Sequence, residues 1–348
     1  MPCDATLLPQ KEAEMASSVS GKPVAAYLHR GRLALLGVGA AVALTMLTTV
    51  SAAAAPEVIA TIPVGNAPLG EAVNLISGDV YVPNAGDGTV SVISGRNEKV
   101  VATIPVGSAP HDVATNWLTD RVFVANVVSN TVSVINGRTN RVTATIPVGT
   151  NPVGVAVDVE TDTIYVANFA GNAVSVINGR TDEVTATIQV GTSTSAVAID
   201  QETDTVYVAD DVANTVTVIS GRTNTVTGTI TVGNAPFEVA VNPETDTVYA
   251  SNHADNTVSV INGRTDKVTA VIPVGANPFG VAVSPLTEAV YVANFGDNTM
   301  SVISPRSNKV ISVLPVGANP FGVAINPLTG NVYVSNSGAN TVQVMRGY

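Results

Sequence analysis

The chain has little charge, few aromatic rings and almost no cysteine. Charged residues make up 12% of its 348 residues, where about 25% is usual, and Phe, Trp and Tyr together make up 4%. The single cysteine, Cys3, excludes a disulfide framework. A hydrophobic share of 45% also excludes a disordered chain, which would combine high charge with few apolar residues.

Basic residues are also scarce. The chain holds 16 Lys and Arg against 27 Asp and Glu, for a net charge of −11. Four of the basic and three of the acidic residues precede residue 56, which leaves 12 basic and 24 acidic residues in the remainder. An acidic surface repels phosphate backbones and anionic lipid headgroups. We therefore expect no binding to nucleic acid and no docking on anionic lipid.

From residue 56 onward the chain repeats a unit of 42 residues, represented well by Val142 to Glu183. One aromatic position recurs at this spacing in every copy: Tyr81, Phe123, Tyr165, Tyr207, Tyr249, Tyr291 and Tyr333. One glycine position does the same: Gly65, Gly107, Gly149, Gly191, Gly233, Gly275 and Gly317. A period in the 40s made of short β-type runs is typical of a β-propeller, with one blade per repeat.

Each repeat divides into four short runs of Val, Ile and Thr bounded by Gly, Pro, Asn and Asp, which predicts four strands and their turns. In the copy that begins at Val142, the strands are expected at Val142–Val148, Val153–Val159, Thr163–Ala167 and Ala173–Ile177. The runs are apolar on both faces, as expected for a blade that is sandwiched between two neighbours.

Proline and alanine predict which strand lies at the rim and which lies at the axis. The first strand carries proline in five copies: Pro63, Pro105, Pro147, Pro273 and Pro315. Proline cannot donate a ladder hydrogen bond and is tolerated on edge strands, so the first strand should be outermost. The second strand carries alanine in every copy, which suits the crowded axis: Ala72, Ala114, Ala156, Ala198, Ala240, Ala282 and Ala324.

The order of the strands at the two ends predicts how the ring closes. The repeats open with a rim-type strand, Val58–Val64, and end with a fourth-type strand, Val342–Met345. The opening strand should therefore complete the last blade, which leaves no blade unfinished. We predict an all-β fold for residues 56–348: a seven-bladed β-propeller of four-stranded antiparallel blades, closed by pairing of the N-terminal strand with the C-terminal blade.

Residues 1–55 have the pattern of an export segment. The basic residues Lys22, Arg30 and Arg32 precede the uncharged run from Leu33 to Val50, and alanines suited to a cleavage site follow it. A cleaved signal peptide is one interpretation. An uncleaved membrane anchor is the other, because the 18 residues of the run approach the minimum length of a membrane span. In both cases we expect the repeats to be secreted or at the cell surface.

Several motifs resemble those of the YVTN β-propeller repeat family. They include Tyr-Val-Ala-Asn at Tyr165–Asn168 and Tyr291–Asn294, Tyr-Val-Ser-Asn at Tyr333–Asn336, and the recurring runs N-T-V-S-V-I-N-G-R and A-T-I-P-V-G. The resemblance extends from Pro56 to the C-terminus. It implies an exported or surface-associated propeller, such as a surface-layer component, in a family mostly without an assigned reaction. More distant relatives include lactonase-type propellers and a streptogramin lyase. The family motif is structural and implies no catalytic residues.

The positions at which the copies differ are expected to carry function. The loop before the second strand and the turn after the third strand should emerge on one face, around the mouth of a central channel. The candidate ligand-binding residues in these segments are His111, Asp112, Asp210, Asp211, Glu238, His253, Phe237, Phe279 and Phe321. Aromatic walls with a few converging polar groups are typical of a small-ligand pocket.

Two classes of function fit these residues. No catalytic or phosphate-binding motif occurs, which favours an exported non-enzymatic scaffold that binds a protein, a glycan or another cell-envelope partner through the mouth of the channel. The alternative is a lyase- or lactonase-like enzyme that uses His253 and Glu238. A small-molecule ligand stays open, and membrane contact is expected only through an uncleaved N-terminal segment. We predict no cofactor and assign no catalytic or metal-binding residue.

Overall fold

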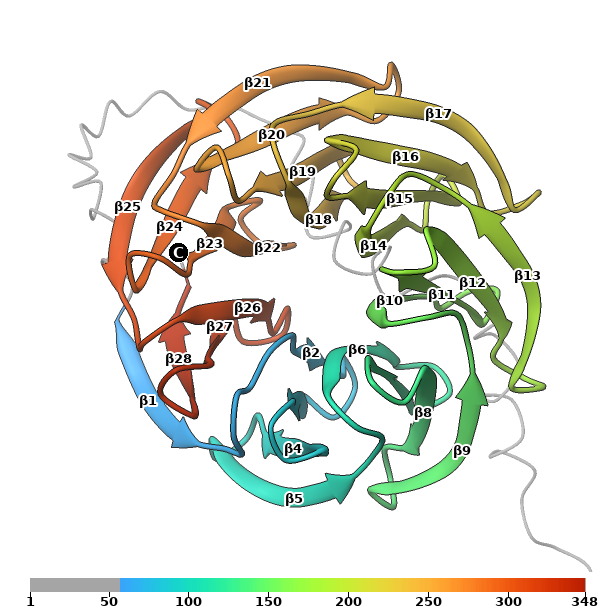
Figure 1. The fold of residues 1–348 in the computed structure, drawn as a ribbon. Helices are drawn as coiled ribbons and strands as arrows, with labels where there is room; N and C mark the ends of the chain where they lie inside the picture. The colour runs from blue at the N-terminus through green and yellow to red at the C-terminus, as the bar shows by residue number, and fades with distance from the viewer. Residues whose placement is uncertain (1–56, 348) are drawn as a thin grey trace, which may run out of the picture. The chain divides into compact units, whose positions relative to one another are not determined.

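The computed structural model describes residues 57–347, so the predictions for residues 1–55 lie outside the described residues. The described part consists of 28 strands in seven four-stranded antiparallel sheets, arranged in a ring (Figure 1). Within this range no helix is long and apolar enough to span a membrane. The prediction of a seven-bladed β-propeller is confirmed.

Blades are numbered 1 to 7 from the first complete sheet. From here on the strands of a blade are counted from the axis to the rim, so that the alanine strand is the first and the proline strand is the fourth. The inner strands are β2 (Ala72–Val73), β6 (Pro110–Asn116), β10 (Pro152–Asp158), β14 (Thr194–Asp200), β18 (Pro236–Asn242), β22 (Pro278–Val283) and β26 (Pro320–Ile325). The second strands are β3 (Val80–Asn84), β7 (Arg121–Asn126), β11 (Thr163–Asn168), β15 (Thr205–Asp210), β19 (Thr247–Asn252), β23 (Val290–Asn294) and β27 (Asn331–Asn336).

The third strands are β4 (Thr89–Ser94), β8 (Thr131–Asn136), β12 (Ala173–Asn178), β16 (Thr215–Ser220), β20 (Thr257–Asn262), β24 (Thr299–Ser304) and β28 (Thr341–Arg346). The rim strands are β5 (Lys99–Pro105), β9 (Arg141–Pro147), β13 (Glu183–Gln189), β17 (Thr225–Thr231), β21 (Lys267–Pro273), β25 (Lys309–Pro315) and, for blade 7, β1 (Val58–Pro63). The predicted positions of the proline strand at the rim and the alanine strand at the axis are confirmed.

Strand β1 closes the ring by completing blade 7, whose strand order is β1-β28-β27-β26. Ile62 lies opposite Val342 in the β1–β28 ladder. The pairing continues past both ends of β1, because the Val64 amide donates to the Asn340 carbonyl and the Arg346 amide donates to the Glu57 carbonyl, each at 3.0 Å. The predicted closure is confirmed.

Burial differs from the expectation that every strand is buried on both faces, because the inner strands are partly exposed, as in β6, and so are the rim strands. The second and third strands are buried almost throughout, as in β11 and β12. The rim strands instead alternate between exposed and buried positions, as in β9. The difference arises because the outermost strand lies at the circumference, where adjacent blades have splayed apart and one side of the strand meets water.

The recurring aromatic residue forms a hydrogen bond to the next blade in blades 3 and 7. Tyr165 of blade 3 is buried, and its hydroxyl donates to Asn224 Oδ1 of blade 4 at 3.3 Å. Tyr333 of blade 7 donates to Glu98 Oε1 of blade 1 at 3.1 Å, across the closing junction. A buried hydroxyl needs such a partner, which accounts for tyrosine rather than phenylalanine at this position.

Blade 2 is the exception, because it carries Phe123 and has no hydroxyl to offer. Arg121 replaces the missing bond: its guanidinium lies 5.2 Å from the centre of the Phe123 ring and donates to the Gly179 carbonyl of blade 3. The same group forms an ion pair with Asp182. A charged side chain thus forms the link to the next blade that tyrosine forms in blades 3 and 7.

Six of the seven second strands end in asparagine, and in blades 1, 2 and 6 this residue holds the segment that enters the blade. Asn84 Oδ1 accepts a hydrogen bond from the Gly65 amide at 3.1 Å, and its Nδ2 donates to Thr89 and Ser91 at 3.0 Å. A Cβ on Gly65 would lie 2.6 Å from Asn84 Cγ, so only glycine allows this approach. The asparagine column is therefore structural.

Two substitutions in β1 test the closure. Ile62 is 5% exposed and Ile59 is 40% exposed on the same strand. If β1 is docked, Ile62→Ala should lower the free energy of unfolding by about 3 kcal/mol, as core truncations do, and Ile59→Ala should change it by less than about 0.5 kcal/mol. Urea unfolding measures both. Equal, negligible effects from the two variants would show that β1 does not complete blade 7.

Candidate functional site

The strand order gives the propeller two distinct faces. The mouth face carries the loops that lead into the inner strands and the turns that join second to third strands. The opposite face carries the turns that join first to second and third to fourth strands. All nine predicted site residues lie in segments of the mouth face or at strand ends that border it, as expected from the repeat.

Four rings meet at the axis on the mouth face and form what we call the axial cluster: His111, Phe237, Phe279 and Phe321. The Phe237 and Phe279 rings lie 4.5 Å apart between centres, and Phe279 stacks on Phe321 at 5.1 Å. His111 of blade 2 lies 5.4 Å from Phe321 of blade 7 and 6.3 Å from Phe237 of blade 5. These blades are not neighbours, so the rings reach across the axis and pack on one another.

A second group of side chains covers one edge of the axial cluster. His253 stacks on Phe279 at 5.4 Å between ring centres, and Phe295 meets Phe279 edge-on at 5.1 Å. His253 Nε2 lies 3.7 Å from Asp211 Oδ1 of the adjacent blade. The side chains of His253 and Asp211 remain 30% and 21% exposed, so this pair is accessible from the mouth face.

His111 is held as a neutral ring. Its Nδ1 lies 2.9 Å from the Val153 carbonyl oxygen, which can only accept, so Nδ1 carries the proton. Burial lowers the pKa of His111 to about 4, although the Val153 carbonyl opposes the shift. At neutral pH this side chain therefore acts as an aromatic and hydrogen-bonding group and not as a cation.

Three carboxyl groups lie beside the axial cluster, on Glu71, Asp112 and Glu238. Burial raises the pKa of Asp112 to about 6 and that of Glu71 to about 8, and it raises the pKa of Glu238 well above its ordinary value. The charge of Asp112 contributes to the raised pKa of both glutamates, and the charge of Glu71 contributes to that of Glu238. Carboxyls from blades 1, 2 and 5 thus interact around the axis.

Two of these carboxyls occupy space that a neighbouring glycine leaves free. Asp112 Oδ2 accepts the Val155 amide at 2.9 Å, and a Cβ on Gly70 would lie 2.5 Å from Asp112 Oδ1. A Cβ on Gly322 would collide with Glu71 Oε2 in the same way. The glycines at these inner-strand positions therefore make room for acidic side chains next to the axis.

Glu71 is a site residue that the sequence-based prediction missed. The other six copies carry valine at its position: Val113, Val155, Val197, Val239, Val281 and Val323. Glu71 is 9% exposed; its Oε1 accepts the Ser335 amide of blade 7 at 3.1 Å, while its Oε2 is buried without a hydrogen-bond partner. The sequence signal that could have identified Glu71 is a single charged residue at a position where every other copy has valine.

Asp210 does not join the other predicted residues at the axis. It occupies the asparagine column, is fully buried within blade 4, and accepts hydrogen bonds from Thr217 at 2.6 Å and Thr215 at 3.2 Å. Burial raises its pKa to about 6. Threonine hydroxyls can donate to a carboxylate where other blades pair asparagine with serine, so Asp210 is a structural variant of the recurring asparagine.

The two histidines do not share a ligand site of the metal-binding kind. The Phe237 ring lies between them, at 6.3 Å from His111 and 6.2 Å from His253. Among residues 57–347 no group of three or more His, Cys, Asp or Glu side chains is arranged to hold a metal ion. Within the same residues the carboxylate that lies within 4 Å of the His253 ring nitrogens belongs to Asp211, at 3.7 Å, and not to Glu238.

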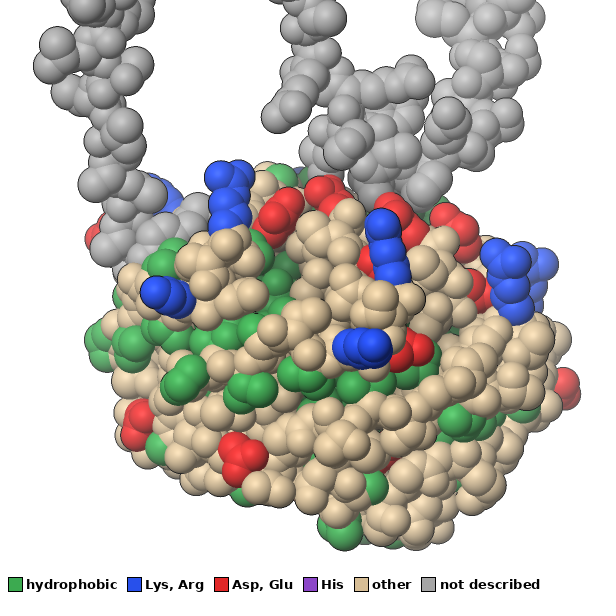
Figure 2. Space-filling view, turned by 90° about the horizontal axis from the view of Figure 1, so that it is seen from above, with side chains coloured by type: hydrophobic (Ala, Val, Ile, Leu, Met, Phe, Trp, Pro, Cys, Tyr) green, Lys and Arg blue, Asp and Glu red, His purple; other side chains and the backbone are tan. Residues whose placement is uncertain are grey.

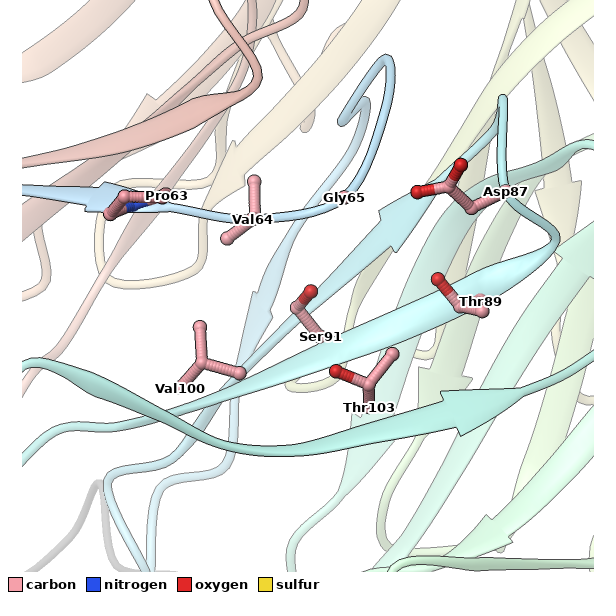
Figure 3. Close-up of a pocket in the computed structure, with 8 residues that line it drawn as sticks. All are labelled: Pro63, Val64, Gly65, Asp87, Thr89, Ser91, Val100 and Thr103. Carbon is pink, nitrogen blue, oxygen red and sulfur yellow. The ribbon is translucent and has the colours of Figure 1, made fainter.

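Shallow grooves also occur between blades near the rim. One of about 420 Å³ lies between β1 and blade 1, where Pro63, Asp87, Ser91 and Thr103 line it (Figure 3). A second, of about 390 Å³, has equivalent residues between blades 2 and 3, including Pro147, Ser175 and Thr187. Because matching positions line both, the grooves follow from the packing of the repeat. Neither is lined by a predicted site residue.

Comparison with solved structures finds the same fold. One match is described as Kuenenia stuttgartiensis hydrazine synthase; it has a TM-score of 0.74 at 20% sequence identity, covering 80% of this chain and 95% of that chain. At this identity the likeness shows the fold alone. No family model and no curated protein matches the chain. The resemblance to the YVTN repeat family thus stays a prediction.

The buried carboxyls predict how stability depends on pH. The folded-state pKa of Glu71, about 8, lies above its ordinary value of 4.5. The stabilisation from its neutral form is therefore full below about pH 4.5 and is lost as pH rises through about 8. Glu71→Gln should raise the melting temperature at pH 9 by roughly 5 °C and leave it unchanged at pH 5.

Glu244→Gln, at an exposed position of the opposite face, is the matched control and should have no effect at either pH. Thermal unfolding between pH 5 and pH 9 makes the comparison. A Glu71→Gln protein that is equally stable to the wild type at pH 9 would contradict the assignment of a buried, neutral glutamic acid at the blade 1–blade 7 junction.

Proposed function

We propose that the protein is an exported, non-enzymatic scaffold that binds a protein or glycan of the cell envelope through its mouth face. The axial cluster carries this proposal. Its rings come from four blades and gather at one end of the axis, half-buried, on a frame whose tyrosine, glycine, alanine and asparagine columns repeat. Repeat proteins bind through the positions at which their copies differ.

Exposed side chains around the axial cluster extend the surface available to a partner. Val128 and Val212, in turns of the mouth face, are 66% and 64% exposed. In protein interfaces, most of the binding energy typically comes from packed aromatic residues at the centre, which are surrounded by a more solvent-exposed rim. The His253–Asp211 pair adds a polar contact at the edge of the rings.

The charge of the mouth face restricts the partner. Among residues 57–347 this face carries no Lys or Arg, because all 12 lie at strand ends and turns of the opposite face. Its solvent-accessible acidic residues are Asp87, Asp211, Asp255 and Asp297, whereas burial raises the pKa of Glu71, Asp112, Asp210 and Glu238. A neutral or basic partner surface is therefore favoured over an acidic one.

Export and cell-surface location rest on sequence support. The basic flank, apolar run and alanines of residues 1–55 have the composition of an export segment. The YVTN-like motifs add the expectation of a surface-associated propeller. The enzyme alternative has less support, because lyase chemistry would use His253 beside Glu238, and His253 is paired with Asp211 instead. Lactone or streptogramin turnover that His253→Ala abolishes would favour the enzyme.

Site-specific crosslinking locates the binding face. A photoreactive residue at Val212 should capture an envelope component from living cells, whereas the same residue at Val271, 56% exposed on the rim, should not. Phe279→Val introduces the side chain that blade 3 carries at this position, so the fold should accept it. Loss of the central ring should weaken binding of the captured partner at least about tenfold.

Glu202→Gln, on the opposite face, serves as the control and should bind normally. Equal capture from Val212 and Val271 would contradict the proposal. So would unchanged affinity in a Phe279→Val protein that unfolds at the same temperature as the wild type.

A further inference from the structure

The turns between first and second strands differ between blades at one position of the opposite face. Three consecutive blades carry an acid there: Glu160, Glu202 and Glu244 in blades 3, 4 and 5. The remaining four carry an aliphatic residue, and we call these the apolar arc: Leu286, Leu328, Ile76 and Leu118 in blades 6, 7, 1 and 2. These side chains are 50%, 62%, 66% and 60% exposed, respectively.

The four turns that bear the apolar arc touch one another in their order around the ring. Leu286 Cδ1 of blade 6 lies 3.8 Å from where a Cβ on Gly330 of blade 7 would be. Asn326 Nδ2 of blade 7 lies 3.4 Å from the corresponding point on Gly78 of blade 1. Asn74 Nδ2 of blade 1 donates to Asp120 Oδ1 of blade 2 at 2.8 Å. Exposed aliphatics gathered in this way indicate an interaction surface, unlike singly scattered ones.

Basic side chains accompany the apolar arc. Figure 2 shows the visible Lys and Arg gathered toward one face of the disc. On that face blades 6, 7, 1 and 2 bring eight basic residues against five acidic ones, whereas blades 3, 4 and 5 bring four against eleven. The exposed basic residues beside the arc are Arg96, Lys99, Arg138, Arg141, Arg306, Lys309 and Arg346. One half of the face is therefore apolar and basic, and the other half is acidic.

The chain outside the described residues joins the propeller at the same half. Glu57 lies beside Arg346 at the start of β1, on the opposite face of blade 7. The uncharged run from Leu33 to Val50 ends seven residues before Glu57. An extended chain of this length spans at most about 25 Å. The chain that carries this run is therefore attached to the propeller at blade 7, one of the four blades that bear the apolar arc.

From these observations we infer that the apolar arc and its basic surround form a membrane-docking surface, which seats the propeller on an anionic bilayer with the mouth face turned away. Aliphatic side chains that enter the interfacial layer beside Lys and Arg on anionic headgroups are the combination by which peripheral proteins bind membranes. A second copy of the chain fits less well, since two such halves would oppose like charges.

This inference differs from the expectation, drawn from the net charge, that the chain does not dock on anionic lipid. The net charge of −12 after residue 55 is an average over two faces and two halves. Screening limits electrostatic attraction to about 8–10 Å at physiological ionic strength, so a bilayer responds to the basic half that it touches. Five of the 24 acidic residues after residue 55 lie on that half, and the other 19 lie on the acidic half or on the mouth face.

Local reporters on the full chain test the inference, since they separate docking from any attachment through residues 1–55. In a Cys3→Ser background, a polarity-sensitive fluorophore is placed at Leu118→Cys or Leu328→Cys in the arc, at Glu202→Cys in the acidic half, or at Val212→Cys on the mouth face. Vesicles of phosphatidylcholine with about a quarter phosphatidylglycerol carry a lipid-borne quencher. Only the two arc positions should shift to shorter wavelength and be quenched.

Paired substitutions identify the side chains responsible. Ile76→Glu with Leu286→Glu copies what blades 3 to 5 carry, so the fold should tolerate it, and it should reduce quenching at Leu328→Cys at least about tenfold. Val128→Glu with Val212→Glu changes equally exposed aliphatics on the mouth face and should leave quenching unchanged.

The inference would be overturned by quenching at Glu202→Cys or Val212→Cys as strong as at the arc positions, or by no quenching at any position. Unaltered quenching in the Ile76→Glu/Leu286→Glu variant would also overturn it. So would a shift in the emission wavelength of the arc fluorophores without vesicles in a protein that sediments as a dimer.

Discussion

The hydrogen-bonded pairing of β1 with β28 is the constraint on which the rest of the structure depends. Six blades are finished by the strand that follows them in sequence, and blade 7 is finished by the strand that precedes blade 1. Without that pairing, β28 would be a free edge and blades 1 and 7 could separate. The pairing therefore turns a row of repeats into a closed ring with a fixed axis.

Other interactions reinforce the same junction. Tyr333 reaches from blade 7 to Glu98 of blade 1, and Glu71 of blade 1 accepts the Ser335 amide of blade 7. Glu71 thus links the first and last blades by a hydrogen bond and is also one of the three carboxyls around the axis. The electrostatic state of the candidate site is thus coupled to the closure of the ring, because ionisation of Glu71 acts on both.

Most of the fold could be predicted from the repeat, because each recurring residue has a local physical reason. Proline indicates the rim strand because it cannot donate a ladder hydrogen bond. Glycine indicates where the backbone approaches the asparagine at the end of a second strand, and tyrosine indicates a contact between neighbouring blades. Membership of the mouth face followed from register alone. Side-chain direction did not: Asp210 points into its blade because it replaces a structural asparagine, and His253 meets Asp211 instead of Glu238 because adjacent turns approach there.

The residues that escaped prediction share a cause. Glu71 differs from the valines at the equivalent positions, but its bond to Ser335 and the apolar arc emerge only when copies are compared by position around the ring, where blade 7 is next to blade 1. Leu118 and Leu286 are far apart in the sequence, yet both belong to a set of four neighbouring blades. The two faces consequently combine different chemistry on one frame, with rings and carboxyls on one side and aliphatic and basic groups on the other.

Amide hydrogen exchange of β1 tests the closed ring most directly. The amides of β1 that donate to β28 should exchange as slowly as their counterparts in β13, the rim strand of blade 3, because both are held by a complete ladder. Exchange in β1 at the rate of an unstructured segment, with β28 unprotected on the same side, would contradict the account.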